Sequence, residues 1–262
     1  MLFTSPIAPD HVSDTLTPPF YFFSDNHLSS QNGPEQRERL RDMLACLAAI
    51  RDSGGTLFIL GDFFDFWFDH RDYVPPALEP AVAALRSLRE HGVTVHYIGG
   101  NHDYWVEGYL TREAGIRFHP GPIEFDFGGT RFFCLHGDEV IYRHAVYPLI
   151  RRILRAPLAI ALLKCLPPAA IYALGERISK YNQRVDQIPA APEAMIAKLR
   201  AFLRDKLREG YGIAISGHVH KSDLIRWETG TTVILGDWIH GRRYGRWDEE
   251  SGFRLIDLNA TS

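Results

Sequence analysis

Five short apolar runs in this chain each end in polar side chains, and this pattern constrains the fold more than any other feature of the sequence. The runs cover residues 20–23, 56–60, 94–98, 131–135 and 212–216, are rich in β-branched or aromatic residues, and have the length of strands. The clusters that follow them are Asp25-Asn26-His27, Gly61-Asp62 with Asp65, Gly100-Asn101-His102-Asp103, His136-Gly137-Asp138 and Gly217-His218-Val219-His220. Because loops at the carboxyl ends of strands line the ligand crevice of an α/β sheet, the five clusters are expected to meet in one place.

Helical periodicity fills the gaps between the first runs. Residues 34–51 place Leu40, Leu44, Leu47 and Ala48 on one helical face, and residues 78–90 do the same with Val82, Leu85 and Leu88. Strands that alternate with amphipathic helices at this spacing predict βαβ units with mainly parallel strands. From residue 123 onward two apolar runs flank Gly128-Gly129, a pair that accepts the positive φ angles of a hairpin turn. The expected fold class is therefore α/β, with hairpins added in the second half.

The segment between the fourth and fifth runs is helix-rich and interrupted by prolines. We expect residues 1–262 to form a single domain, with a helical cap insertion over residues 141–209. Between residues 141 and 186 this insertion carries eight basic residues and two acidic ones, although the whole chain has a net charge of -3. Such a composition suits anionic lipid head groups and acyl chains, but it also suits a helical pair that packs on the domain with its arginines solvated.

Charge and cysteine content bound the class of protein. A net charge of -3 and a pI near 6.5 lack the basic excess of a nucleic-acid-binding protein. Cys46, Cys134 and Cys165 are an odd number of cysteines among apolar residues, which predicts buried free thiols in a reducing compartment. Residues 1–19 contain no Lys or Arg, unlike a signal peptide, and no run reaches the ~18 apolar residues of a membrane span. A cytoplasmic location is expected.

The residue types in the five clusters are those that hold divalent metal ions. Carboxylate oxygen, amide oxygen and imidazole nitrogen favour Mn, Fe, Co or Zn, and the absence of Cys argues against a thiolate zinc site. In Asp25-x-His27 and His218-x-His220, residues two apart on an extended segment would point the same way and present two ligands to one region. Taken singly, an Asp or His at a strand end is more often a turn former or a helix cap.

The ordered motifs D-x-H, G-D-x-x-D, G-N-H-D, H and G-H-x-H, from Asp25 to His220, resemble those of the calcineurin-like metallophosphoesterase superfamily. The resemblance implies a four-layer αββα sandwich of two mixed sheets. It also implies two bound divalent metal ions, and we expect both to be Mn²⁺. One ion would be held by Asp25, His27, Asp62 and His220, and the other by Asp62, Asn101, His136 and His218, so that Asp62 bridges them. The resemblance makes His102 a catalytic residue near the leaving group or a phosphate oxygen. Asp103 is a candidate to orient it, because catalytic imidazoles commonly donate their second nitrogen to a carboxylate.

A narrower resemblance is to the UDP-2,3-diacylglucosamine hydrolases of lipid A biosynthesis. It is carried by the motif Gly61-Asp62-Phe63-Phe64-Asp65-Phe66-Trp67, by His136-Gly137-Asp138 and by the helix-rich insertion before Gly217. It implies hydrolysis of a pyrophosphate to UMP and 2,3-diacylglucosamine 1-phosphate, a cap that receives acyl chains, and contact with an anionic membrane surface. Substrate contacts are expected from Asn101, Tyr181, Asn182 and Arg184. The aromatic residues beside Asp62 are expected to be core packing.

Two other functions remain open at this stage. The first is a metallophosphoesterase for another nucleotide diphosphate or phosphodiester, such as ADP-ribose or a nucleotide sugar. It stays open because this chain has His102 where the best-known UDP-2,3-diacylglucosamine hydrolases have Arg. The second is a non-catalytic scaffold on the same fold, which the complete set of predicted ligands disfavours.

Overall fold

Two six-stranded sheets form the centre of the molecule. The computed structural model describes residues 8–31, 33–142, 153, 155–186 and 191–261, without the side chains of residues 178–192 and 260–261. The first sheet has the order β12-β11-β2-β3-β4-β5, and the strands β2 to β5 are parallel while β11 is antiparallel to both its neighbours. Its strands are β2 (Phe20–Phe23), β3 (Thr56–Ile59), β4 (Thr94–Ile98), β5 (Arg117–His119), β11 (Arg243–Asp248) and β12 (Gly252–Asp257).

The second sheet has the order β1-β6-β7-β8-β10-β9 and is also mixed. Its strands are β1 (Asp10–His11), β6 (Ile123–Phe127), β7 (Thr130–Leu135), β8 (Ile213–Ser216), β9 (Asp223–Trp227) and β10 (Gly230–Ile234). The strands β7, β8 and β10 are parallel, whereas the hairpin β6–β7 is antiparallel. Its turn is formed by Gly128 and Gly129, at φ angles of 56° and 77°, which confirms the predicted hairpin.

An aromatic core joins the two sheets face to face. Phe20 and Phe58 of the first sheet meet Phe125 and Phe132 of the second, and all four side chains are fully buried. The ring centroids of Phe58 and Phe125 lie 4.8 Å apart in a stacked arrangement, and Phe20 meets Phe125 edge-on at 5.6 Å. Each buried Phe side chain contributes roughly 1.5–3 kcal/mol to folding through the hydrophobic effect. This packing fixes the position of the first sheet relative to the second, and with it the positions of their strand ends.

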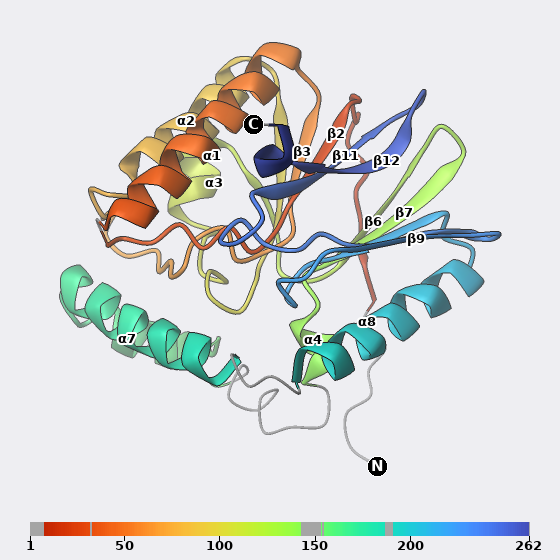
Figure 1. The fold of residues 1–262 in the computed structure, drawn as a ribbon. Helices are drawn as coiled ribbons and strands as arrows, with labels where there is room; N and C mark the ends of the chain where they lie inside the picture. The colour runs from red at the N-terminus through yellow and green to blue at the C-terminus, as the bar shows by residue number, and fades with distance from the viewer. Residues whose placement is uncertain (1–7, 32, 143–152, 154, 187–190, 262) are drawn as a thin grey trace.

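Helices cover the outer faces of both sheets, which confirms the expected αββα sandwich (Figure 1). The first sheet is covered by α1 (Pro34–Ser53), α2 (Glu79–Glu90) and α3 (Tyr109–Ala114), and the second by α8 (Ala191–Arg208). The predicted face of α2 is buried at Val82, Leu85 and Leu88. The face of α1 is rotated from the prediction, because Met43, Cys46 and Ile50 are buried with Leu47 while Leu44 and Ala48 are only partly covered.

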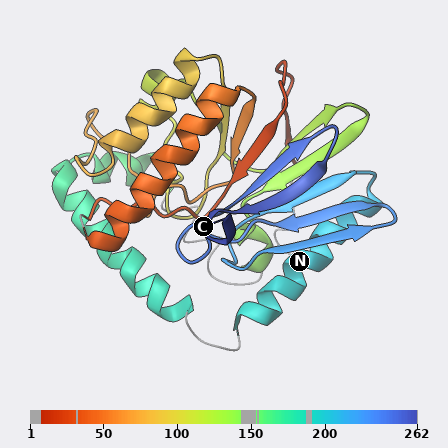
Figure 2. The same cartoon turned by 45° about the horizontal axis from the view of Figure 1, so that its top comes forward.

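The expected insertion over 141–209 contains two structurally different parts. Leu199, Leu203 and Leu207 of α8 pack on the second sheet, so α8 forms the fourth layer of the sandwich. The helices α6 (Pro157–Leu163) and α7 (Pro168–Asp186) lie on the opposite side from α8, near one end of α1 (Figure 2). Among the described residues no single helix has the length and apolarity to cross a membrane, although α6 and Pro168–Arg177, bent by 112°, meet that test as a pair.

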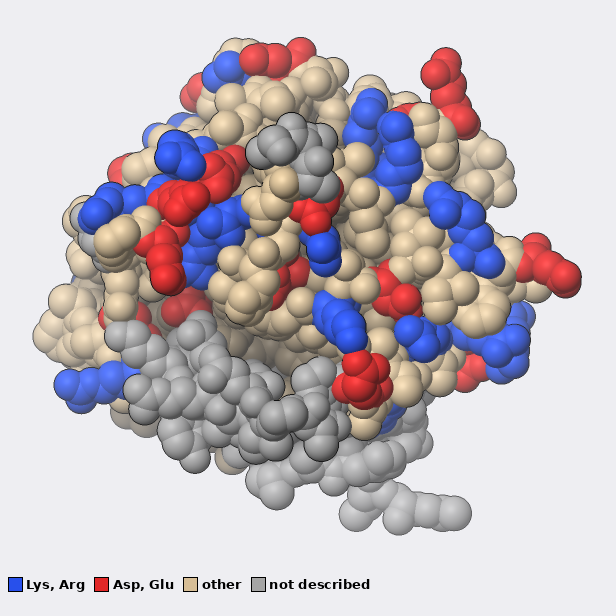
Figure 3. Space-filling model, in the orientation of Figure 1, with Lys and Arg blue, Asp and Glu red and all other residues tan. Residues whose placement is uncertain are grey.

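Charged residues of both signs are intermingled over the sandwich on the face shown in Figure 3, in keeping with the small net charge. The three cysteines are free, as predicted, but the expectation that all three are buried is wrong for Cys165. Cys46 and Cys134 are buried, whereas Cys165 at the end of α6 is exposed. Burial raises the pKa of the Cys46 thiol to about 12, which makes a thiolate nucleophile at that position inaccessible near neutral pH.

Candidate metal centre

The predicted ligands come from the ends of five strands that belong to both sheets. Asp25 and His27 follow β2, Asp62 follows β3, Asn101 follows β4, His136 follows β7, and His218 and His220 follow β8. Backbone hydrogen bonds tie these loops together: the His27 N–H donates to the Asp62 carbonyl at 3.0 Å, and the Gly217 N–H donates to the His136 carbonyl at 2.9 Å. The two sheets therefore bring all seven predicted ligands to one edge of the sandwich.

The backbone at five of these ligands is left-handed rather than extended. The φ angles are 54° at Asp25, 46° at His27, 55° at Asp62, 74° at His218 and 53° at His220. The expectation that both segments are extended is therefore wrong, although Asp25 and His27 do reach the same donor group, whereas His218 and His220 belong to different ones. Non-glycine residues in this region cost of order 1–3 kcal/mol each and persist where surrounding structure enforces them, which is typical of ligand-binding sites.

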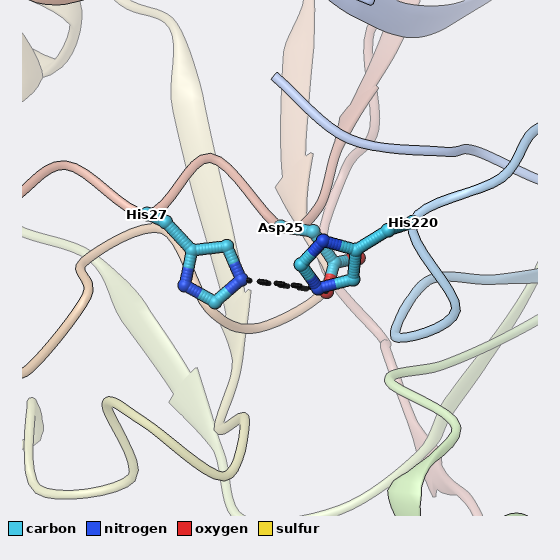
Figure 4. Close-up of side chains that lie close together, drawn as sticks. All are labelled: Asp25, His27 and His220. Carbon is cyan, nitrogen blue, oxygen red and sulfur yellow. Dashed lines mark hydrogen bonds and ion pairs between the residues drawn. The ribbon is translucent and has the colours of Figure 1, made fainter. Parts of the chain in front are cut away.

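The first donor group consists of Asp25, His27 and His220 (Figure 4). The Nε2 atoms of His27 and His220 are 3.3 Å apart, and Asp25 Oδ1 lies 3.5 Å from the Nε2 atom of His220. The other oxygen of Asp25 accepts hydrogen bonds from the Ser24 hydroxyl at 2.6 Å and from the His218 N–H at 2.7 Å. The Oδ1 atom is buried without a hydrogen-bond partner, so it is the oxygen that suits a cation.

The second donor group consists of Asp62, His136 and His218, with Asn101 beside it. The Nε2 atom of His136 lies 3.4 Å from Asp62 Oδ2, 3.0 Å from Asn101 Oδ1 and 3.2 Å from the Nδ1 atom of His218. Asp62 Oδ1 accepts the backbone N–H of His102 at 2.9 Å. Carboxylate, amide oxygen and imidazole in this arrangement fit a divalent cation such as Mn, Fe, Co or Zn.

Charge coupling within the cluster shifts the pKa values of its imidazoles in opposite directions. Burial lowers the pKa of His136, but the neighbouring Asp62 carboxylate outweighs it and raises that pKa to about 10. Burial and the adjacent His136 lower the pKa of His218 to about 4. Protons and metal ions compete for the same nitrogen atoms, so the affinity of these imidazoles for a metal ion would depend on pH.

The nitrogen of His136 and His220 that faces away from the centre has a hydrogen-bonding or ionic partner. The Nδ1–H of His136 donates to the Leu60 carbonyl at 2.8 Å, and the Nδ1 atom of His220 lies 3.3 Å from Asp237 Oδ2. Such partners orient an imidazole and fix the tautomer that binds a metal. Asp237 was not among the site residues predicted from the sequence. The signal was present, because Gly236-Asp237 follows the apolar strand β10 as the other clusters follow theirs.

His102 and Asp103 lie beside the second group, but they do not form the expected pair. The Nδ1–H of His102 donates to the Asp65 carbonyl at 2.8 Å, and Asp65 Oδ1 lies 3.5 Å from the Nδ1 atom of His27. Asp103 instead accepts the backbone N–H groups of Asp62 and Gly100, at 3.0 and 3.2 Å, and the hydroxyl of Tyr97. Asp65 therefore has the orienting contact expected of Asp103, whereas Asp103 fixes the loop that carries Asp62.

Glycines allow the loops to approach one another as closely as they do. A Cβ atom on Gly100 would lie 2.0 Å from Asp62 Oδ1, and one on Gly217 would lie 1.8 Å from the Ser24 hydroxyl. A Cβ on Gly61 would lie 2.7 Å from the Nδ1 atom of His136. At these three positions the absence of a side chain lets the backbone come close to the predicted ligands.

The helix α7 lies against the segment that follows Asp65. Phe66 packs edge-on against Tyr172 at 5.4 Å, and a Cβ atom on Gly175 would lie 2.4 Å from the Phe66 ring. Glu176 accepts a hydrogen bond from the Gln31 side chain at 3.0 Å, in the loop after His27. Phe63, Phe64 and Trp67 are buried core residues, as predicted, whereas Phe66, expected in the core as well, is only partly buried because it packs against α7 instead. Tyr181, Asn182 and Arg184 belong to α7, but their side chains lie outside the described residues.

Comparisons with known proteins agree with this geometry. Residues 18–222 match the calcineurin-like phosphoesterase family. The UDP-2,3-diacylglucosamine hydrolase of Porphyromonas gingivalis is 30% identical over 245 residues, which cover 87% of this chain and 93% of that protein. The enzyme of the same name from Pseudomonas aeruginosa strain UCBPP-PA14 is 30% identical over 230 residues, 83% of this chain and 90% of that protein.

Among solved structures, a novel archaeal phosphodiesterase superposes with a TM-score of 0.49 at 14% identity, covering 92% of this chain and all of that one. The chain belongs to the calcineurin-like phosphoesterase family. It is a metal-dependent hydrolase, and the residue groups described above are its candidate metal-binding residues.

Proposed function

We propose that this protein is a dinuclear metal-dependent pyrophosphate hydrolase that cleaves UDP-2,3-diacylglucosamine to UMP and 2,3-diacylglucosamine 1-phosphate. The observation that carries the proposal is the pair of adjacent donor groups, Asp25 with His27 and His220, and Asp62 with His136 and His218. Asp62 is the proposed bridging ligand and Asn101 the proposed amide ligand of the second ion. The names of the relatives from P. gingivalis and P. aeruginosa support the choice of substrate.

Two divalent ions in such groups would activate a water molecule and stabilise the negative charge of an in-line displacement at phosphorus. The chain's own residues would orient the reactants. His102 donates its Nδ1–H to the Asp65 carbonyl at 2.8 Å, and this contact leaves Nε2 as the nitrogen that, when protonated, would donate to the leaving oxygen or to a phosphoryl oxygen. Its backbone N–H donates to Asp62 Oδ1, so His102 and the proposed bridging ligand are held in fixed relation.

The lipid part of the substrate is proposed to contact α6 and its surroundings. Leu158 and Leu162 of α6 are 72% and 63% exposed, and no residue of this helix is buried. Leu166 and Leu174 add further exposed apolar surface on the same insertion. Exposed apolar side chains in such number mark contact with a lipid or a partner, and Lys and Arg flank them in the sequence. We propose peripheral association with the cytoplasmic face of an anionic membrane, with Mn²⁺ as the native metal.

The test is the release of UMP from UDP-2,3-diacylglucosamine in the presence of Mn²⁺, compared with the release of UMP from UDP-N-acetylglucosamine and of AMP from ADP-ribose. A clear preference for the acylated substrate, lost on addition of EDTA and restored by Mn²⁺, is expected. Equal rates on all three substrates would instead favour the alternative function, a phosphoesterase that acts on another nucleotide diphosphate. Replacement of His102 by Ala is expected to lower kcat by about 100- to 10,000-fold. Full activity of this variant would refute the catalytic role of His102.

A further inference from the structure

Arg155 of the insertion reaches the loop that carries Asn101 and His102. Its Nη2–H donates a long hydrogen bond, 3.4 Å, to the carbonyl of Gly100. Its guanidinium carbon lies 3.3 Å from the centroid of the Tyr104 ring. A guanidinium over an aromatic face at this distance is held in place, because the cation–π contact and the hydrogen bond restrict it together. The positive charge of Arg155 is thus fixed one residue away from a proposed metal ligand.

The ring that supports Arg155 is itself held by the sandwich. Phe118 of β5 meets the Tyr104 ring edge-on, at 5.8 Å between centroids. A Cβ atom on Gly99, at the end of β4, would lie 2.9 Å from Tyr104 Cδ2. Tyr104 therefore lies in contact with the strand ends that define the site, and it presents a ring face to the insertion. The position of Arg155 follows from the fold rather than from an isolated surface contact.

A diphosphate diester needs a cation that the predicted ligand set does not contain. All seven predicted ligands are Asp, Asn or His. Metal ions bound to them would neutralise the charge of the phosphate that is attacked. The second phosphate carries a further negative charge, which needs its own cation. A guanidinium is suited to that group because its planar N–H donors pair with two phosphate oxygens at once.

We propose that Arg155 binds the phosphate that is not attacked and thereby makes the site selective for diphosphate diesters over esters of a single phosphate. The inference rests on the proposed function for its diphosphate substrate. It adds a specificity-determining residue from the insertion to a reaction whose other proposed residues lie at strand ends. The Gly100 carbonyl and the Tyr104 ring restrict how far Arg155 can follow a ligand, so the second phosphate has to lie on the Asn101 side of the centre.

The experiment uses the full-length protein loaded with Mn²⁺ and three variants, Arg155→Ala, Arg155→Lys and the control Arg177→Ala. Arg177 is an exposed arginine of the same insertion. Hydrolysis of bis(p-nitrophenyl) phosphate reports on a single-phosphate diester, and UDP-N-acetylglucosamine is added as a competitor. In Arg155→Ala the inhibition constant of the competitor is expected to rise about 10- to 100-fold, while KM and kcat for the chromogenic ester change less than about twofold. Arg155→Lys should fall between Arg155→Ala and wild type, and Arg177→Ala should match wild type.

Other outcomes separate the alternatives. If Arg155 only ties the insertion to Tyr104, then Tyr104→Leu will reproduce the defect of Arg155→Ala on the acylated substrate, and neither change will alter competition by UDP-N-acetylglucosamine. An equal loss on the single-phosphate ester, or a competitor that does not bind the wild-type protein, would also overturn the proposal for Arg155. Release of UMP from the acylated substrate by the wild-type enzyme tests the proposed function separately.

Discussion

Individual residues at the site have backbone conformations that are intrinsically unfavourable for residues other than glycine. Asp25, His27, Asp62, His218 and His220 all have φ angles between 46° and 74°. Hydrogen bonds from neighbouring loops maintain them, such as the one from the His218 N–H to Asp25 Oδ2. The motif reveals which residue types are present, but a left-handed backbone at Asp or His depends on contacts between segments far apart in the chain. This part of the site was therefore not predictable from the sequence.

Asp237 is expected to tune metal affinity through His220. Its Oδ2 atom lies 3.3 Å from the Nδ1 atom of His220 and 2.7 Å from the Nδ1 atom of His240. The change Asp237→Asn removes the charge that orients the imidazole, and it should weaken Mn²⁺ binding by about 10- to 100-fold in calorimetric titration. Asp126→Asn, which alters an exposed carboxylate, is the control. Wild-type affinity in Asp237→Asn would rule out the orienting role.

Gly100 is expected to be intolerant of a single added methyl group. The Cβ atom of Gly100→Ala would lie 2.0 Å from Asp62 Oδ1 and 2.6 Å from the Asp62 nitrogen, so Asp62 has to move. A displacement of about 1 Å at a reacting centre costs about 100-fold in rate, and kcat/KM for a chromogenic phosphodiester should fall by that order. Gly121→Ala is the matched control because its Cβ atom meets nothing within 4 Å. Equal activity of the two variants would contradict the close packing of Gly100 against Asp62.

At the scale of elements, neighbouring strands carry two adjacent histidines outside the metal centre, one fully buried and one partly exposed. His96 of β4 is fully buried, stacks on Phe58 at 5.2 Å, and its Nδ1 atom lies 3.1 Å from the Nε2 atom of His119 of β5. Burial, with a smaller contribution from His119, lowers the pKa of His96 to about 3. The folded protein therefore keeps His96 neutral at pH values where the unfolded chain binds a proton.

This difference predicts a pH-dependent stability. Between pH 6.5, the ordinary value for His, and about pH 3, the unfolded state binds the extra proton, so stability falls as pH falls through that window. Each such group contributes about 1.4 kcal/mol per pH unit to the slope. His96→Phe should flatten the slope of the unfolding free energy measured by urea denaturation between pH 7 and pH 5. His119 and Asp14, whose carboxylate lies 3.8 Å from His96 Nε2, remain in the variant. A slope as steep as in wild type would therefore mean that these two groups, and not His96, cause the pH dependence of stability.

The order and type of the elements were largely predictable because hydrophobic periodicity reports burial directly. The strand runs ending at Phe23, Leu60 and Ile98 and the buried face of α2 follow from that pattern. The separation of α8 from α6 and α7 was not predictable, since all three segments combine apolar residues with basic ones in or beside them. What distinguishes α8 is the surface of the second sheet beneath Leu199 and Leu203, which exists only in the folded molecule.

For the whole molecule, the apolar surface of α6 is expected to govern association with lipid. Leu158 and Leu162 are its large exposed apolar side chains. The double change Leu158→Asp with Leu162→Asp removes apolar area and adds negative charge, so it should lower co-sedimentation with vesicles of anionic phospholipid by at least about tenfold. The control is Ala201→Asp, which introduces the same charge at an exposed site of α8. Unchanged vesicle binding of the double variant would refute the membrane role of α6.

Each proposed metal ion has ligands from both sheets. The first donor group joins Asp25 and His27, which follow β2, to His220, which follows β8, and the second joins Asp62 after β3 to His136 after β7. A bound ion therefore ties together two layers that otherwise meet through the aromatic core. Because ligand binding to the folded state alone raises its stability by mass action, we expect the protein's resistance to unfolding and proteolysis to rise and fall with the supply of divalent cations in the cell.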